Sequence, residues 1–254
     1  MKWKVEIGFP PGPRDLHVGD FSSWLIYRFY YQEPVIWKFF KRCVKSGMDV
    51  LNIGAHVGIH VPLLSSLVGE SGRVFAFEPT PRTFQLLTKN CELLGNVGLY
   101  EEAVTDKHGE TVRMTGFRWG LFSLWNTLGD YGRFLPPTSL IVNGLLRERF
   151  SVKTVSIDSW VRENPAIKPG VIIVDAENWE YKVLFGGMSM IMSCKPIIIF
   201  EGGDIKRSIS TRKVIDLLIR IGYEIFELSR EGNLVEHIPQ RVYKYHINLI
   251  ALPK

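Results

Sequence analysis

Acidic residues follow two apolar runs of the chain, where they could act on a substrate. Asp175, Glu177 and Glu180 come after the run VIIV, and Glu201 comes directly after the run IIIF. A hydroxyl group is a poor nucleophile at neutral pH, so a carboxylate that removes its proton would assist transfer of a chemical group to its oxygen. We expect Asp175 or Glu177 to be this general base and Glu201 to orient the substrate.

Two other roles for these carboxylates stay open. Acidic residues in the first turn of a helix stabilise that helix, and Asp175, Glu177 or Glu180 could serve this structural purpose alone. Asp175 and Glu201 could also bind a divalent cation. Two carboxylates are too few ligands for such an ion, however, so we expect no metal site.

A glycine-containing turn and a second carboxylate are typical of an adenosine-binding site. The run VLNI leads into Gly54, Ala55, His56 and Gly58. Gly54 would let the backbone turn sharply and a ligand approach closely, and Gly58 would let the next helix pack tightly with its free N–H groups near the ligand. Glu78 follows the run VFAF, 20 residues after Gly58, where it could accept hydrogen bonds from both ribose hydroxyls.

The glycine spacing separates two classes of adenosine cofactor. Dinucleotide enzymes show GxGxxG because the pyrophosphate lies against bare backbone. Here the spacing is GxxxG, and His56 occupies the place of the central glycine. S-adenosylmethionine carries no phosphate and tolerates a side chain there, so we predict this cofactor rather than NAD. His56 could instead be a catalytic base, although hydrogen bonding within the turn is the commoner role.

These residues require a sheet that brings the ends of several strands together. From about Asp49 onward, apolar runs without alternation take turns with helical patterns, as expected for parallel strands buried on both faces. Segments 223–228 and 245–252 are too close for a helix between them and should pair antiparallel. We predict an α/β fold with a mostly parallel, doubly wound sheet and an antiparallel C-terminal edge. Ligands bind beyond the carboxyl ends of such strands.

Composition supports an ordinary globular protein of one domain, residues 1–254. Hydrophobic residues make up 46% of the chain and charged residues 22%, which excludes a disordered chain, a collagen-like repeat and a coiled coil. We expect a helical or irregular N-terminal segment over 1–48 and a cap insertion over 116–151, where aromatic residues lie among glycines and prolines. Three scattered cysteines and the lack of a signal or transmembrane pattern predict a cytoplasmic protein.

Three motifs in order resemble the FkbM family of S-adenosylmethionine-dependent methyltransferases. NIGAHVG, FEPTP and VDAENWE are similar to the family patterns DxGANxG, FEP and KIDVEGxE, with support from Thr154–Asp158 and from Phe200–Glu201. The resemblance implies the class I methyltransferase (Rossmann-like) fold and O-methylation of a sugar, glycan or polyketide-like hydroxyl. It also implies a cofactor site formed by Asn52, Gly54, Ala55, His56, Gly58 and Glu78. Asn52, Ile173 and Asn178 depart from the pattern, which has Asp, Lys and Gly there.

Two alternatives to a small-molecule or glycan acceptor remain. The net charge of +5 and two basic clusters would suit an RNA ribose methyltransferase, although no base-methylation motif of the Asn-Pro-Pro-Tyr type is present. The clusters are formed by Lys38, Lys41, Arg42 and Lys45, and by Lys206, Arg207, Arg212 and Lys213. The other alternative is a non-catalytic module that only binds S-adenosylmethionine. The oligomeric state is not predicted.

Overall fold

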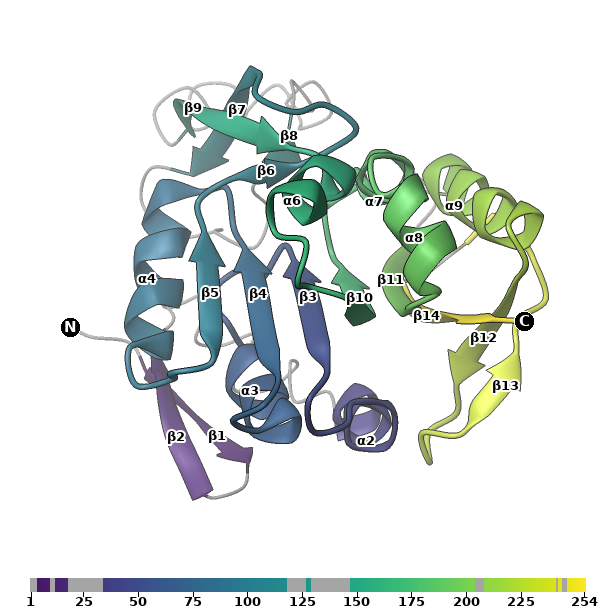
Figure 1. Cartoon of the computed structure of the whole chain (residues 1–254), viewed down its shortest axis with the longest axis horizontal. Coiled ribbons are helices and arrows are strands. Elements are labelled where there is room, and N and C mark those ends of the chain that lie inside the picture. Colours follow the sequence, from purple (N-terminus) through teal and green to yellow (C-terminus); the bar gives the residue numbers. More distant parts are fainter. Residues whose placement is uncertain are drawn as a thin grey trace, which may run out of the picture.

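The computed structural model describes residues 4–9, 12–17, 34–117, 127–128, 147–203, 208–240, 242–243 and 246–254. An eight-stranded sheet has helices on both faces, and a smaller sheet lies beyond the tips of its parallel strands (Figure 1). No helix within the described ranges combines the length and the apolar character of a membrane span.

The main sheet has the strand order β13-β12-β14-β11-β10-β3-β4-β5. Its parallel part consists of β3 (Asp49–Ile53), β4 (Arg73–Phe77), β5 (Val97–Tyr100), β10 (Pro169–Val174) and β11 (Ile197–Gly203). The other members are β12 (Tyr223–Leu228), β13 (Leu234–Glu236) and β14 (His246–Pro253). β14 runs antiparallel to both of its neighbours, β11 and β12. The predicted mixed sheet is confirmed, and the unpredicted β13 forms its outer edge.

Helices cover the sheet in two groups. α2 (Pro34–Cys43), α3 (Val61–Val68) and α4 (Pro81–Cys91) pack on one face. α6 (Ile157–Glu163), α7 (Glu180–Phe185), α8 (Met188–Cys194) and α9 (Ser208–Arg220) pack on the other. Successive strand residues alternate between the two cores, with Val50 in the first and Leu51 in the second. Each such buried aliphatic side chain contributes about 1.5–3 kcal/mol, which explains why most residues of these strands are apolar.

The N-terminal segment differs from the expectation of helical or irregular structure over 1–48. β1 (Lys4–Phe9) and β2 (Gly12–His17) form an antiparallel hairpin, and only α2 is helical among the described residues of this segment. Val5, Ile7 and Phe9 alternate with other residues in β1, a period of two that is typical of a strand. The surrounding prolines masked this signal in the sequence.

A second sheet has the order β6-β9-β7-β8. It consists of β6 (Ala103–Val104), β7 (Thr111–Phe117), β8 (Thr127–Leu128) and β9 (Arg147–Val155). Met114 and Val152 pack against Ala103 and Trp179, so this sheet contacts the loop that follows β10. The aromatic part of the expected cap, including Trp119, Phe122 and Trp125, lies outside the described residues, and its role as a cap stays a prediction.

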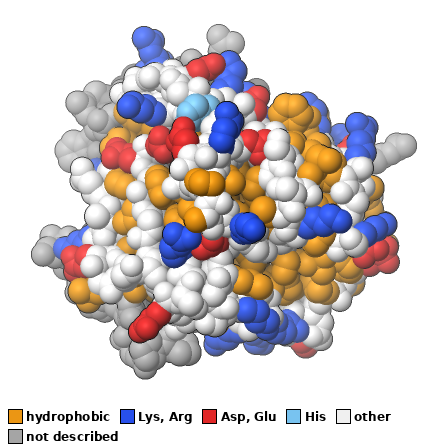
Figure 2. Space-filling view, viewed as in Figure 1, with side chains coloured by type: hydrophobic (Ala, Val, Ile, Leu, Met, Phe, Trp, Pro, Cys, Tyr) orange, Lys and Arg blue, Asp and Glu red, His pale blue; other side chains and the backbone are white. Residues whose placement is uncertain are grey.

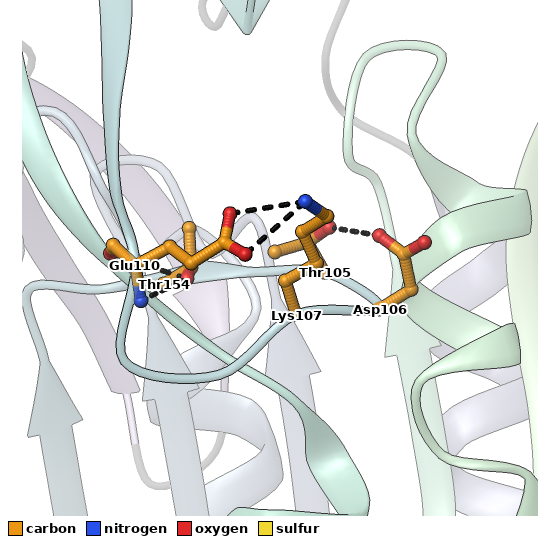
Figure 3. A network of polar contacts seen from close by, with 5 residues as sticks. All are labelled: Thr105, Asp106, Lys107, Glu110 and Thr154. Carbon is orange, nitrogen blue, oxygen red and sulfur yellow. Dashed lines mark hydrogen bonds and ion pairs between the residues drawn. The ribbon is translucent and has the colours of Figure 1, made fainter.

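Polar contacts fix the base of the second sheet (Figure 3). The Glu110 N–H donates to Thr154 Oγ1 at 3.1 Å, Thr154 Oγ1 donates to the Glu110 carbonyl at 3.2 Å, and Lys107 pairs with the Glu110 carboxylate at 3.1 Å. Asp158, four residues beyond Thr154, accepts hydrogen bonds from the N–H groups of Ser189 and Met190 at 3.0 and 2.8 Å. The family-like fragment Thr154–Asp158 therefore holds the second sheet and the start of α8.

Candidate active site

Four candidate residues follow one row of paired residues across the sheet. The row is made by the register pairs Phe77–Ile53, Ile53–Val174 and Val174–Phe200. Adjacent strands lie about 4.8 Å apart, so the residues that come next on each strand lie side by side at the carboxyl edge. They are Glu78, Gly54, Asp175 and Glu201. One correction concerns Glu201, which lies within β11 and pairs with Asn248 of β14 rather than ending its strand.

Gly54 makes the sharp turn after β3. Its φ is +79°, and a Cβ atom there would lie 1.8 Å from the carbonyl oxygen of Asp175. The N–H groups of Gly54 and Ala55 both donate to the Phe77 carbonyl, at 3.0 and 2.9 Å. The close approach predicted for this glycine is thus an approach to the backbone of the neighbouring loop, and only glycine fits there.

The rest of the turn after β3 is held by α4. Gly58 has a φ of +86°, and a Cβ atom there would lie 2.7 Å from Leu87 Cδ1. Asn90 donates a hydrogen bond from Nδ2 to the Val57 carbonyl at 2.7 Å. Asn90 was not among the residues that the sequence pointed to, because its distance of 33 positions from the turn gives no local signal.

Glu78 joins the loops that follow β3 and β4. Its Oε2 accepts a hydrogen bond from the His56 N–H at 3.1 Å, and its Oε1 accepts one from the Thr80 N–H at 2.9 Å. The side chain is buried, and this burial raises the pKa of Glu78 from 4.5 to about 7. Each carboxylate oxygen has two lone pairs, so the group retains the capacity to accept hydrogen bonds from ribose hydroxyls.

Backbone strain concentrates in the loops after β3 and β10. Among the described residues, four non-glycine residues have a left-handed φ: His56 (52°), Glu177 (48°), Asn178 (83°) and Lys195 (47°). The first three lie in these two loops, and the fourth ends α8. Such conformations cost free energy and persist mainly where the surrounding structure enforces them, often at functional sites.

The loop after β10 is organised by Glu180. Its Oε1 accepts hydrogen bonds from the N–H groups of Ala176 and Asn178, both at 3.1 Å, and the side chain is buried. Glu180 therefore has the structural role that the sequence left open. α7 begins at Glu180, so Glu177 lies in an irregular loop and not on a helical face shared with Glu180. Asp175 N–H donates to the Ile53 carbonyl at 3.0 Å.

Asn52 and Ile173 meet on neighbouring strands. They are register partners of β3 and β10, and both are buried, Asn52 with 2% of its surface exposed. Asn52 Nδ2 is a buried donor for which the described residues offer no hydrogen-bond acceptor. A polar atom in this condition beside Gly54 fits a site that receives a polar ligand. The two departures from the family pattern, Asp to Asn and Lys to Ile, thus remove opposite charges from adjacent positions.

His60, close to the same turn, is a structural residue. Its Nδ1 accepts a hydrogen bond from Trp37 Nε1 at 3.0 Å, and its ring packs edge-on against Phe40. Burial lowers the pKa of His60 to about 4, so the ring is neutral at physiological pH. Within the part of the chain that the structure describes, no three His, Cys, Asp or Glu side chains are grouped to hold a metal ion.

Comparison with known families decides between the cofactor classes. The model of the methyltransferase FkbM domain matches residues 52–225, from within β3 to within β12. The chain belongs to the FkbM methyltransferase family. It is therefore a methyltransferase whose methyl donor is S-adenosylmethionine, and the predicted family and cofactor are confirmed. Three features of the site fit S-adenosylmethionine: the buried hydrogen-bond donor of Asn52, the tight turn at Gly54 and the carboxylate of Glu78.

Individual relatives of this FkbM methyltransferase are distant. The hexuronic acid methyltransferase AglP of Haloferax volcanii is 29% identical over 194 residues, which cover 74% of this chain and 69% of the relative. A crystallised FkbM methyltransferase of Methylobacillus flagellatus is 17% identical with a TM-score of 0.46, over 81% of this chain and 44% of its own. This chain thus spans less than half the length of that protein. Aeropyrum pernix fibrillarin, solved with S-adenosylmethionine, is 13% identical with a TM-score of 0.48, over 98% and 82% of the two chains.

Proposed function

We propose that this FkbM methyltransferase methylates a hydroxyl group of a sugar or glycan, with hexuronic acids as the first acceptors to test. The observation that carries the proposal is the row of residues at the carboxyl edge of the sheet. Gly54 and Glu78 of the proposed cofactor site stand beside Asp175 and Glu201, so a candidate base would lie next to the bound methyl donor. The sugar is supported by the name of the relative from Haloferax volcanii, a hexuronic acid methyltransferase.

The residues at the carboxyl edge of the sheet would have different roles in the reaction. When bound, S-adenosylmethionine supplies a sulfonium methyl group that needs little activation. Glu78 and Asn52 would hold this cofactor, and the turn at Gly54 would shape its site. Asp175 or Glu177 would take the proton of the acceptor hydroxyl, and Glu201 would orient the acceptor. Because the methyl group needs little activation, the main task of such a site is to align the two bound reactants.

A nucleic-acid acceptor has no separate observation in its favour among the described residues, and Lys206 and Arg207 of the second basic cluster lie outside them. Lys38, Lys41, Arg42 and Lys45 form the solvated face of α2 and of the residues after it, and Arg42 donates to Asn233 Oδ1 at 3.1 Å. Figure 2 shows Lys and Arg side chains dispersed over one face of the molecule, with acidic and apolar side chains among them. A continuous basic stripe, which phosphate backbones require, is not seen on that face.

Methyl transfer to sugars tests the proposal directly. Purified protein is incubated with S-adenosylmethionine and glucuronic acid, its methyl glycoside, glucose or a short RNA, and S-adenosylhomocysteine is measured by mass spectrometry. We expect turnover with a hexuronic acid, reduced about 100-fold or more in Asp175→Asn or Glu177→Gln. Turnover with RNA alone would replace the proposed acceptor, and cofactor binding without turnover on any acceptor would indicate a non-catalytic module.

We also propose a reducing compartment, the cytoplasm, for this enzyme. Cys43, Cys91 and Cys194 are all free thiols in the structure. Burial raises the pKa of the Cys91 thiol to about 12, so this side chain behaves as a small apolar group rather than a reactive thiolate. Thiol titration of the protein purified without reductant tests this, since a disulfide between any two of them would contradict it.

A further inference from the structure

We propose that Asn178 determines acceptor specificity, because its Oδ1 atom accepts a hydrogen bond from a hydroxyl group of the acceptor. The inference rests on the proposed sugar methylation. Asn178 Oδ1 is buried, and the described residues offer it no hydrogen-bond donor. Most buried polar side-chain atoms in folded proteins have a partner, so an acceptor without one needs an explanation.

The position of Asn178 is fixed from both sides. Its N–H donates to Glu180 Oε1 at 3.1 Å, and its carbonyl accepts a hydrogen bond from Ser210 Oγ of α9 at 3.4 Å. Its φ of +83° is a strained conformation for a residue with a side chain. These contacts fix the backbone at Asn178, and the loop tolerates two costs there: a strained φ and a side-chain acceptor atom without a partner among the described residues.

Glycine would avoid both costs at this position. It adopts a positive φ freely and carries no polar side-chain atom, and glycine is the residue of the family pattern that this loop resembles. Asparagine is among the residues that tolerate the left-handed region best. The exchange therefore keeps the path of the loop and adds one hydrogen-bond acceptor within three residues of Asp175 and next to Glu177.

The chemistry of the amide oxygen selects its partner. An amide oxygen only accepts hydrogen bonds, so the partner must carry a proton to donate. The carboxylate of a hexuronic acid has none at neutral pH, whereas its ring hydroxyls do. Asp175 and Glu177 lie within this loop, Glu180 begins the helix after it, and their carboxylates repel a further one. The acceptor therefore presents a ring hydroxyl, and not its acidic group, to Asn178.

The test compares variants of Asn178 on methyl glucuronide and on its 2-, 3- and 4-deoxy analogues. Asn178→Gly removes the acceptor atom and keeps the φ, and Asn178→Asp keeps acceptor oxygens. Lys195→Gly is the matched control, because it relieves the same type of strain at an exposed site at the end of α8. Thermal unfolding and titration with S-adenosylhomocysteine confirm that each variant is folded and binds the cofactor.

We expect Asn178→Gly to keep its cofactor affinity within about twofold and to lose about tenfold in kcat/KM with methyl glucuronide. Asn178→Asp should retain more activity, and Lys195→Gly should match the wild type. The deoxy analogue that lacks the contacted hydroxyl should be equally slow with wild type and Asn178→Gly, a result that a merely structural role would not give.

Three outcomes would overturn the inference. Equal kcat/KM of wild type and Asn178→Gly on methyl glucuronide would leave the proposed function intact and remove the role of Asn178. Loss of cofactor binding in Asn178→Gly would assign the residue to the fold of the loop. No transfer by the wild type to any sugar, with normal cofactor binding, would overturn the proposed function and this inference together.

Discussion

Gly54 and Asp175 meet backbone to backbone at the carboxyl edge of the sheet. A Cβ atom on Gly54 would lie 1.8 Å from the Asp175 carbonyl oxygen, a separation that no side chain permits. This contact joins the turn that we propose binds the cofactor to the loop that carries the candidate base. Backbone packing thus fixes the position of the turn after β3 relative to the loop after β10.

Gly54→Ala should lower the free energy of unfolding by about 4 kcal/mol or prevent folding, because backbone atoms must move. Gly109→Ala is the matched control, since Gly109 has a φ of +74° and nothing within 4 Å of an added Cβ. It should cost only the left-handed strain, about 1–2 kcal/mol. Urea unfolding of both variants measures the difference, and equal losses would refute the importance of the Gly54–Asp175 contact.

Cofactor binding should depend on pH through Glu78. Burial raises its pKa from 4.5 to about 7 in the folded protein. At a pH between 4.5 and about 7, Glu78 is therefore protonated in the folded chain and ionised in the unfolded chain. The contribution of Glu78 to the free energy of unfolding falls as the pH rises through this range. Ribose hydroxyls donate to the ionised form, so bound cofactor favours release of that proton.

We therefore expect S-adenosylhomocysteine to bind more tightly as the pH rises towards 7 and to change little above it. Calorimetry in buffers of different ionisation enthalpy would detect the proton released on binding. Glu78→Gln should bind more weakly, with a flat pH profile. If that variant kept the same pH dependence, the titrating group would have to be another one.

Asn52 and Ile173 should behave as a coupled pair. Asn52→Asp places a carboxylate in a buried position beside isoleucine and should cost about 2–4 kcal/mol of unfolding free energy, and Ile173→Lys should cost a similar amount. Because the two are register partners, the charges in the double variant can pair. The double variant should be more stable than the sum of both losses by about 1–3 kcal/mol. Strict additivity in urea unfolding would show that the two positions do not interact.

Glu180 should matter for the loop rather than for chemistry. Glu180→Ala leaves the N–H groups of Ala176 and Asn178 without their acceptor and should cost about 2–4 kcal/mol of stability. Glu180→Gln keeps a carbonyl oxygen in the same place and should lose less of both stability and kcat. If both variants lost kcat equally while remaining fully stable, the carboxylate charge itself would be catalytic.

The sheet and the turn after β3 could be predicted because their signals are local. Apolar runs such as 171–174 indicate a strand that is buried on both faces of the sheet. Gly54 indicates a sharp turn that other residues cannot make. The hairpin β1–β2 escaped prediction because prolines masked its alternation, and β13 escaped because three residues carry little periodicity. Contacts between distant segments, such as Asn90 with the Val57 carbonyl, leave no pattern in a single sequence.

The roles of the acidic residues could be predicted only in part. The sequence placed Asp175 and Glu201 at neighbouring strands, as the register of β10 and β11 shows. It favoured Glu177 over Glu180 as the base but left a structural role open for both, because that role depends on where the helix begins. Helix α7 starts at Glu180, whose carboxylate turns back onto the loop, and Glu177 stays outside the helix. Identity of the base therefore rests on kinetics of the individual variants.

Calorimetric titration with S-adenosylhomocysteine is the most direct test of the site at the carboxyl edge. We predict one site per chain with micromolar affinity in the wild type, lost in Glu78→Ala and kept in Glu110→Ala, which removes a carboxylate of the second sheet. NAD should not bind. A folded wild type that failed to bind S-adenosylhomocysteine, or a Glu78→Ala variant that bound it as tightly as the wild type, would contradict the assignment of this site.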